Sequence, residues 1–158
     1  MLLGVKRGVL DLGRAKDLSV REAGLAVAIT SRANGSPRAS VVNAGVLEHP
    51  LTGEAVVGFV SRGGARKLAD LRDRPRATVV FRSGWEWVAV EGDATVIGPN
   101  DHPDGLDDAS VMLLVRTIYA VAVGGTPEEW SQLDDTMATE RHTAVLIGPV
   151  RVYPSADS

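Results

Sequence analysis

Apolar and polar positions alternate along this chain in short runs that predict β-strands separated by turns. Apolar and β-branched residues gather in runs from residue 25 onward, and a last run follows a longer polar and helical stretch. Short runs of this kind, bounded by Gly, Pro, Asn and Ser, are typical of antiparallel strands. They predict strands at residues 25–30, 40–47, 54–61, 76–83, 85–97 and 141–153.

The residues between these runs favour tight connections. Asn34-Gly35 predicts a hairpin, because both residues tolerate a positive φ. Pro50 and Gly53 mark a second turn, and Ser83-Gly84 a third. Gly92 lies inside the long fifth run and predicts a bulge or a close approach of another group.

Apolar residues are spaced as in a helix in three segments of the chain. A short helix could precede the first strand, and Leu68 and Leu71 predict another at residues 67–73, which Pro75 ends. A helical insert is predicted at about residues 107–138. Its start is marked by Asp107 or Asp108 as a cap, its second helix by Thr126-Pro127, and its apolar face by Val111, Met112, Leu114, Val115, Ile118 and Tyr119.

The predicted elements indicate one mainly β domain over residues 1–158, either a barrel or a sandwich, with flanking helices. The late return strand could close a barrel. A chain of 158 residues, 44% of them hydrophobic, is long enough for one real core.

Charge and composition exclude several classes of function. The net charge of −3 gives no electrostatic basis for binding nucleic acid, and no apolar run approaches the roughly 20 residues that span a bilayer. The absence of cysteine excludes disulfides and thiolate metal sites. We therefore expect a cytoplasmic protein with no nucleic-acid or membrane partner.

One stretch combines glycines with cations in an unusual way. In SRGGARK, residues 61–67, a strand ends in a glycine pair, and Arg66 and Lys67 open a helix. Cations in a first helical turn are unfavourable by about 0.3–1 kcal/mol, whereas an anion there is stabilised by the free amides and the helix dipole. The stretch therefore predicts either an anion site or a simple turn with solvated cations.

Three segments together resemble the pyridoxamine 5′-phosphate oxidase-like split β-barrels. FVSRGGARKLADLRDRPRATVVF is similar to the segment of that family that holds the flavin phosphate. NGSPRASVV resembles its "dGsPrvspv" hairpin, and WEWVAVEGDATVIGPND its "ryveveGrA" strand. The ending of the last segment resembles the actinobacterial members that use the deazaflavin F420. The likeness covers roughly residues 20–100, and it implies a split β-barrel of six or so antiparallel strands.

The resemblance also implies a set of cofactor-binding residues. Ser61, Arg66 and Lys67 would hold the cofactor phosphate, Arg62 would also bind the cofactor, and Arg38 would be a further cation near the phosphate or the tail. The strand residues Ser40, Val41, Val42 and Asn43 would line the cofactor. The family forms homodimers with cofactor sites at the subunit interface, so Trp85 or Trp87 would reach the partner's site.

The function implied is that of an F420-dependent reductase, which transfers a hydride from the reduced deazaflavin to a small organic acceptor. The alternatives are an FMN-dependent oxidase or reductase, and a non-catalytic flavin or haem binder with the same fold. No side chain is identified as catalytic. Vitamin B6 oxidation is not expected, because Arg151 alone stands where that activity uses an Arg–His set. An anionic F420 tail could meet Lys6, Arg7, Arg14 and Lys16.

Other candidates are weaker. His49, His102 and His142 lie far apart without metal-ligand spacing, so no metal site is predicted, and His142 is the most interesting because it begins the last strand. Trp85 and Trp87 would share one strand face, with core or dimer packing as their ordinary role.

Overall fold

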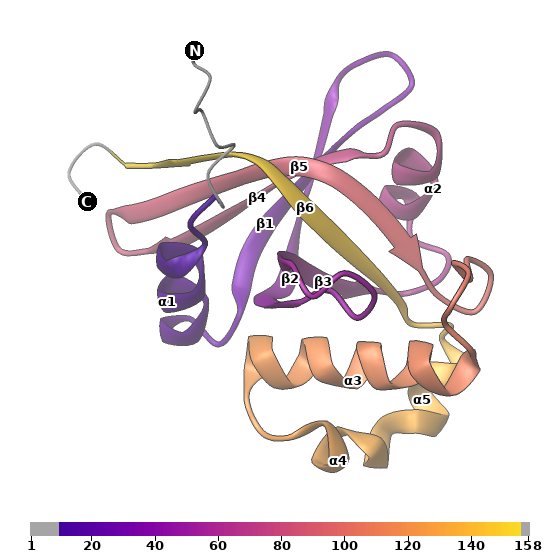
Figure 1. Cartoon of the computed structure of the whole chain (residues 1–158). Coiled ribbons are helices and arrows are strands. Elements are labelled where there is room, and N and C mark those ends of the chain that lie inside the picture. The colour runs from indigo at the N-terminus through magenta and orange to yellow at the C-terminus, as the bar shows by residue number, and fades with distance from the viewer. Residues whose placement is uncertain (1–9, 156–158) are drawn as a thin grey trace.

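Six antiparallel strands form a closed barrel in a computed structural model that describes residues 10–155 (Figure 1). The order around the barrel is β1-β2-β3-β6-β5-β4. The strands are β1 (Leu25–Ser31), β2 (Pro37–Glu48), β3 (Ala55–Ser61), β4 (Arg76–Ser83), β5 (Glu86–Ile97) and β6 (Thr143–Pro154). The predicted mainly β fold with flanking helices is therefore confirmed, and the barrel is chosen over the sandwich.

Strand β6 closes the barrel, because it pairs with β3 on one side and β5 on the other. The predicted bulge at Gly92 is also confirmed, since the register of β5 against β6 shifts between Glu91 and Gly92. A Cβ at Gly92 would lie 2.0 Å from the carbonyl oxygen of Gly148, so only glycine allows this approach.

Most predicted strand limits lie within two residues of the observed ones, and two differences affect the candidate site residues. Strand β2 begins at Pro37, three residues before the predicted start, because the hairpin register continues to the pair Ser31 and Pro37. Trp85 lies in the turn before β5, so it does not share a strand face with Trp87.

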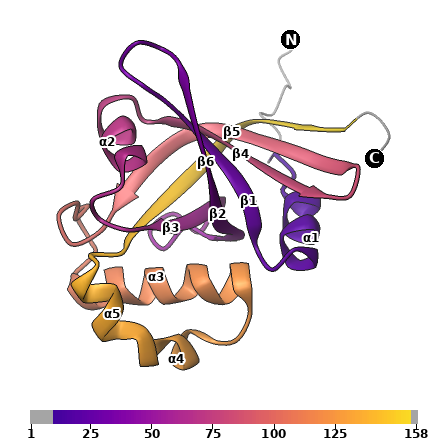
Figure 2. The ribbon, with the colours of Figure 1, turned by 180° about the vertical axis from the view of Figure 1, so that it is seen from behind.

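Helices cover the barrel from three directions (Figures 1 and 2). They are α1 (Gly13–Arg21), α2 (Arg66–Asp73), α3 (Asp108–Val123), α4 (Pro127–Trp130) and α5 (Asp134–Thr139), with a 3₁₀ turn at Ser131–Leu133. Thr126 caps α4 as its sequence suggests, but the segment that follows is broken into short pieces. In both views α3, α4 and α5 lie together below the barrel, and α2 lies higher, beside the strands.

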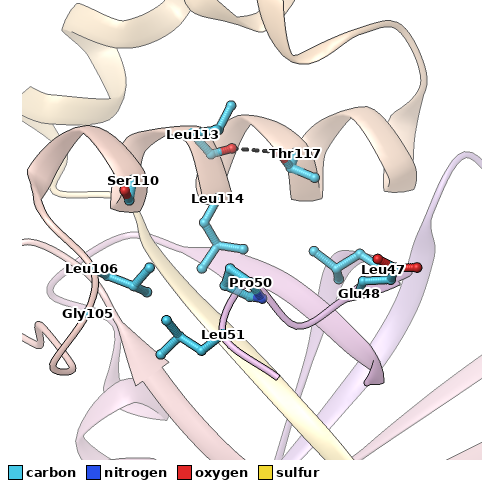
Figure 3. A pocket seen from close by; sticks show the side chains of 10 residues that line it. All are labelled: Leu47, Glu48, Pro50, Leu51, Gly105, Leu106, Ser110, Leu113, Leu114 and Thr117. Carbon is cyan, nitrogen blue, oxygen red and sulfur yellow. Dashed lines mark hydrogen bonds between the residues drawn. The ribbon is translucent and has the colours of Figure 1, made fainter. Parts of the chain in front are cut away.

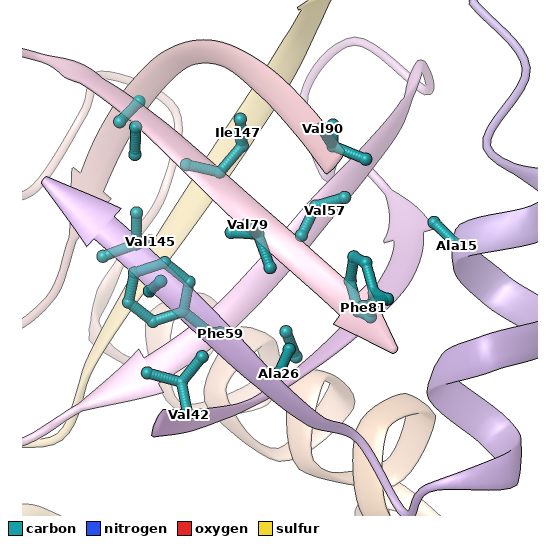
Figure 4. Packing of buried hydrophobic residues seen from close by; sticks show 14 of the residues in the cluster. Ala15, Ala26, Val42, Val57, Phe59, Val79, Phe81, Val90, Val145 and Ile147 are labelled. Atoms are coloured by element: carbon teal, nitrogen blue, oxygen red, sulfur yellow. The ribbon is translucent and has the colours of Figure 1, made fainter. Parts of the chain in front are cut away.

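Two apolar clusters support this arrangement. The first fills the barrel with inward side chains such as Phe59, Phe81 and Ile147 (Figure 4). The second joins the insert to the outside of the barrel, with Ile118 of α3 at its centre. A Cβ at Gly58 of β3 would lie 2.7 Å from Leu47 and 3.2 Å from Ile118, so this glycine leaves room for both side chains.

Within residues 10–155, no single helix is long and apolar enough to cross a membrane. Helix α3 and the segment Pro127–Thr139 reach that length and composition only as a pair bent by 113°.

Candidate functional site

The SRGGARK loop joins the end of β3 to the start of α2. Strand β3 ends at Ser61, and α2 begins at Arg66 after the extended residue Ala65. Ala65 has no side chain that can accept a hydrogen bond from the first turn. The amide of Leu68 donates to the carbonyl oxygen of Ala65 over 3.1 Å, so the amides of Arg66 and Lys67 are left for water or an anionic ligand. The helix dipole adds positive potential there.

Lys67 is half-buried in the first turn of α2, and Arg66 beside it is exposed. Burial lowers the pKa of Lys67, and the nearby charge of Arg38 lowers it further. In the part of the chain that the structure describes, neither Arg66 nor Lys67 lies within ion-pair distance of a carboxylate. Lys67 is therefore an incompletely neutralised cation, which an anionic ligand would stabilise.

Arg38 is held beside Lys67 by a buried network. Its Nε donates to Asp70 Oδ2 over 2.7 Å, and the hydroxyl of Thr30 donates to the same oxygen over 2.8 Å. The hydrogen bond from Arg38 is the main reason that the pKa of Asp70 is lowered, despite the opposing effect of burial. Arg74 adds a weaker ion pair to Asp70 at 3.6 Å.

Two arginines thus pair with one carboxylate, and Lys67 lies near one of them. Arg74 follows the other end of α2 and also lies 3.9 Å from Asp73, so the cations without a carboxylate partner at the helix start, within the described chain, are Arg66 and Lys67. Arg38 engages Asp70 through Nε, which leaves its two terminal nitrogens for another acceptor. The excess of positive charge and the uncapped helix start fit a phosphate group.

Ser61 and Arg62 have other partners in this structure. Ser61 is buried, and its hydroxyl donates to the carbonyl oxygen of Arg62 over 3.3 Å. The side chain of Arg62 is 76% exposed, and its Nε lies 3.0 Å from Glu140 Oε2. Both residues belong to the loop, but within residues 10–155 neither contacts Lys67 or Arg38.

The four predicted residues of β2 divide between two faces, because successive strand side chains alternate. Val42 is buried in the barrel core, and Ser40 lies on the same face toward the Arg38 end. Val41 is 70% exposed on the opposite face, and the Asn43 amide donates to the carbonyl oxygen of Ala23 over 3.1 Å. One ligand can therefore meet only half of these side chains from either face.

The two tryptophans are also separated. Trp85 is 96% exposed in its turn and packs on nothing in the described chain. Trp87 is half-buried and packs edge-on against Tyr153, with ring centroids 6.2 Å apart. The exposed face of Trp85 is therefore available to a partner subunit, whereas Trp87 already has an intramolecular role.

Of the N-terminal cations, Arg14 pairs with Glu86 over 3.0 Å and Lys16 is exposed, whereas Lys6 and Arg7 lie outside the described residues. The tail contact predicted for these side chains stays a prediction.

Sequence reasoning missed a polar chain that joins the insert to the loop. The hydroxyl of Tyr119 lies 2.8 Å from His142 Nδ1, and His142 Nε2 lies 3.0 Å from Glu140 Oε2. Glu140 in turn holds Arg62. The position of His142 at the start of the last strand was the one available signal, but its partner Tyr119 lies on a helix distant in sequence.

An apolar pocket of about 320 Å³ lies between the β2–β3 connection and the first half of α3 (Figure 3). Leucines 47, 51, 106, 113 and 114 dominate its lining, and it shares no residue with the SRGGARK loop. In residues 10–155, no three His, Asp or Glu side chains converge in a way that could hold a metal ion.

Comparison with known proteins identifies the family to which these features belong. The sequence profile described as pyridoxamine 5′-phosphate oxidase matches residues 14–140. No curated protein matches the chain by sequence.

Solved structures share the fold at low sequence identity. A conserved hypothetical protein from Mycobacterium tuberculosis superposes with a TM-score of 0.62 at 16% identity, over 92% of this chain and 84% of that one. A pyridoxamine 5′-phosphate oxidase-related, FMN-binding protein from Nostoc punctiforme gives 0.58 at 16% identity, over 93% and 85%. The haem storage protein HutZ from Vibrio cholerae gives 0.59 at 11% identity, over 91% and 94%.

Proposed function

The chain belongs to the pyridoxamine 5′-phosphate oxidase family, and from that premise we propose that it is an oxidoreductase that binds a phosphate-bearing flavin or deazaflavin. The observation that carries the proposal is the excess of cations at the uncapped start of α2. Arg66 and Lys67 lie there without a carboxylate partner in the described residues, and Arg38, which pairs with Asp70, lies near Lys67.

In this proposal the chain's own residues bind and orient the cofactor. Lys67, Arg38 and the amides at the start of α2 hold the phosphate, since charge-assisted hydrogen bonds are the strongest that a site of this kind can make. Asp70 and Thr30 fix the direction of Arg38. The cofactor supplies hydride chemistry, and the protein supplies its position and electrostatics.

Among such cofactors we propose F420, because the WVAVEGDATVIGPND segment resembles the members that use it. The substrate is then a small organic acceptor that stacks on the ring. FMN is the second candidate, supported by the shared fold of the FMN-binding protein from Nostoc punctiforme. A non-catalytic haem or flavin binder is the third, supported by the fold of HutZ.

The test is a side-by-side titration of the purified protein with F420, FMN and haem. We expect a dissociation constant below about 100 μM for F420, stronger than roughly −5.5 kcal/mol. Tighter binding of FMN would select the second candidate, and binding of haem alone the third. Failure of all three ligands to bind would contradict the proposal.

A substitution at Lys67 tests the proposed contact with the phosphate. Lys67→Ala should weaken binding of F420 or FMN by about 1.5–3 kcal/mol, because it removes a charged hydrogen bond. Riboflavin, which lacks the phosphate, should bind wild type and variant equally. Arg82→Ala is the matched control, since Arg82 is an exposed cation of β4 to which no binding role is assigned. Equal FMN affinity in Lys67→Ala and wild type, with the fold intact, would place the phosphate elsewhere.

We also propose that two chains associate through the outer face of β1 and β2. Val27 and Val41 are paired in register, both are exposed, and Leu25 beside them is exposed as well. A contiguous apolar surface on a sheet is typical of an interface. Light scattering should give twice the 16.7 kDa chain mass, and Val41→Asp should reduce it to one chain. A monomeric wild type that still binds cofactor would contradict this interface.

A further inference from the structure

Arg141 lies in a turn where glycine is the usual residue. Helix α5 ends at Thr139, and the next turns are closed by hydrogen bonds from Arg141 N to Ala138 O at 3.1 Å and from His142 N to Met137 O at 2.8 Å. This is the Schellman pattern, whose left-handed position normally holds glycine. Arg141 occupies it with a φ of 51°, a strained conformation for a residue with a side chain.

The strained turn holds Arg141 directly over the glycine pair of the SRGGARK loop. A Cβ at Gly63 would lie 2.7 Å from the Cβ of Arg141 and 3.3 Å from its Nε. A Cβ at Gly64 would lie 3.9 Å from Arg141 Nη2, with no other atom within 4 Å. Gly63 is therefore required for the docking of this turn, whereas Gly64 leaves open space beside the guanidinium.

The guanidinium of Arg141 has no counter-ion in residues 10–155. Glu140 is the acid next to it in sequence, and its Oε2 is already shared by Arg62 and His142 at 3.0 Å each. Thr143 Oγ1 donates to the carbonyl oxygen of Arg141 over 2.9 Å, which helps to fix the backbone but leaves the guanidinium free. A guanidinium offers five donors in a planar fork that matches phosphate and carboxylate groups.

The loop therefore carries cations at both of its ends. At the α2 end, the charged neighbour that acts on Lys67 is Arg38. At the β3 end, Arg62 is the cation that acts on Glu140 and Tyr119. Arg141 joins the β3 end through its contact with Gly63.

We propose that Arg141 binds a second oxyanion of the ligand, a phosphate or a carboxylate, distinct from the phosphate held by Lys67 and Arg38. The inference rests on the proposed function, since it concerns the same loop and the same ligand. It gives the insert a role in binding, because the last turn of α5 carries Arg141 to the loop. It also implies that a ligand with two separated anionic groups binds better than a ligand with one.

The test uses Arg141→Gly, which removes the side chain and places the usual residue in the turn. The variant should be more stable than wild type, by about 2–4 °C in Tm, because glycine relieves the strain. Arg141→Asn is a second variant, since asparagine tolerates the same conformation. Arg82→Gln is the charge control, because Arg82 is exposed on β4 and forms no ion pair in the described chain.

Wild type and variants are titrated with F420, which carries an anionic tail besides its phosphate, and with FMN, which carries one phosphate. We expect Arg141→Gly and Arg141→Asn to weaken F420 binding about tenfold or more and FMN binding less than threefold, with Arg82→Gln unchanged. Unchanged F420 affinity in both variants overturns the inference alone. An equal loss for FMN and F420 also overturns it, because Arg141 would then act on the phosphate of Lys67. Wild type that binds neither ligand overturns the proposed function itself.

Discussion

Two helical regions pack on the same barrel, and their first turns differ. Helix α3 is capped by Asp107, which accepts a hydrogen bond from Ser110 N at 2.8 Å, and α4 is capped by Thr126. Helix α2 starts at Ala65 without a side-chain cap and with two cations in its first turn. Helices α3 and α4 of the insert thus begin with a side-chain cap, whereas α2 begins without one.

The buried residues of α3 and α2 also differ in polarity. The face that α3 buries is entirely apolar, and it forms a second core against the barrel. Helix α2 buries Leu68 and Leu71 but also Asp70, which holds Arg38 in place. The comparison indicates that α3 joins the barrel through apolar contacts alone, whereas α2 adds a buried ion pair to its apolar contacts.

The largest expected effect tests the stabilising role of the insert. Ile118→Ala should lower the free energy of unfolding by about 3 kcal/mol, because Ile118 is fully buried between α3 and β3 and the truncation leaves a cavity. Leu113→Ala on the same helix should change it by less than about 0.5 kcal/mol, since Leu113 is 49% exposed. Urea denaturation measures both, and equal losses would remove the distinction between the two faces of α3.

A smaller effect is expected at the charged network under α2. Asp70→Asn should lower the free energy of unfolding by about 2 kcal/mol at pH 7, because Arg38 loses its charged acceptor. The folded state lowers the pKa of Asp70 below the 3.8 of a free carboxyl, mainly through Arg38. Its stabilisation is therefore complete above pH 3.8 and is lost as pH falls through the lower, folded-state pKa.

Urea denaturation from pH 7 to pH 2 would show this dependence as a difference between wild type and Asp70→Asn that shrinks only in acid. Asp104→Asn, at an exposed loop position, serves as the control and should leave the pH profile as in wild type. A difference that is constant down to pH 2 would mean that the charge of Asp70 adds nothing to stability.

The smallest effect compares the two helix starts directly. Thr126→Ala should destabilise the protein by about 1 kcal/mol, because it removes the cap of α4. Ala65→Ser should stabilise the ligand-free protein by about 0.5 kcal/mol, because Ala65 already has the extended conformation of a cap. The added hydroxyl would compete with a phosphate for the same amides, so FMN affinity should fall. Thermal unfolding and FMN titration of Ala65→Ser together decide whether the missing cap serves a ligand.

Much of the fold could be predicted from the sequence, because its signals are local. The alternation of apolar residues located the six strands, and Asn34-Gly35, Gly92 and Thr126 marked a turn, a bulge and a cap at their observed positions. The limits of β2 and the place of Trp85 were wrong by a few residues, because pairing with a neighbouring strand decides where a strand starts.

The site was predicted only in part, because its partners are distant in sequence. The SRGGARK pattern pointed to Lys67 and Arg66, but it did not show that Asp70 holds Arg38, or that Arg62 is held by Glu140. Four consecutive residues of β2 were predicted to line one ligand, although the alternation of a strand divides them between two faces.

The sequence by itself determined the number and order of the strands and the place of the helical insert, since backbone preferences and apolar spacing act between near neighbours. Only the tertiary structure decided which cations gather, and that Arg141 lies over Gly63 and Gly64. Barrel closure by β6 brings the end of α5 to the end of β3, and no local pattern records that approach. The physical reason is that charges and packed side chains interact according to their distance in space. Closure of the barrel sets those distances, whatever the separation of the residues along the sequence.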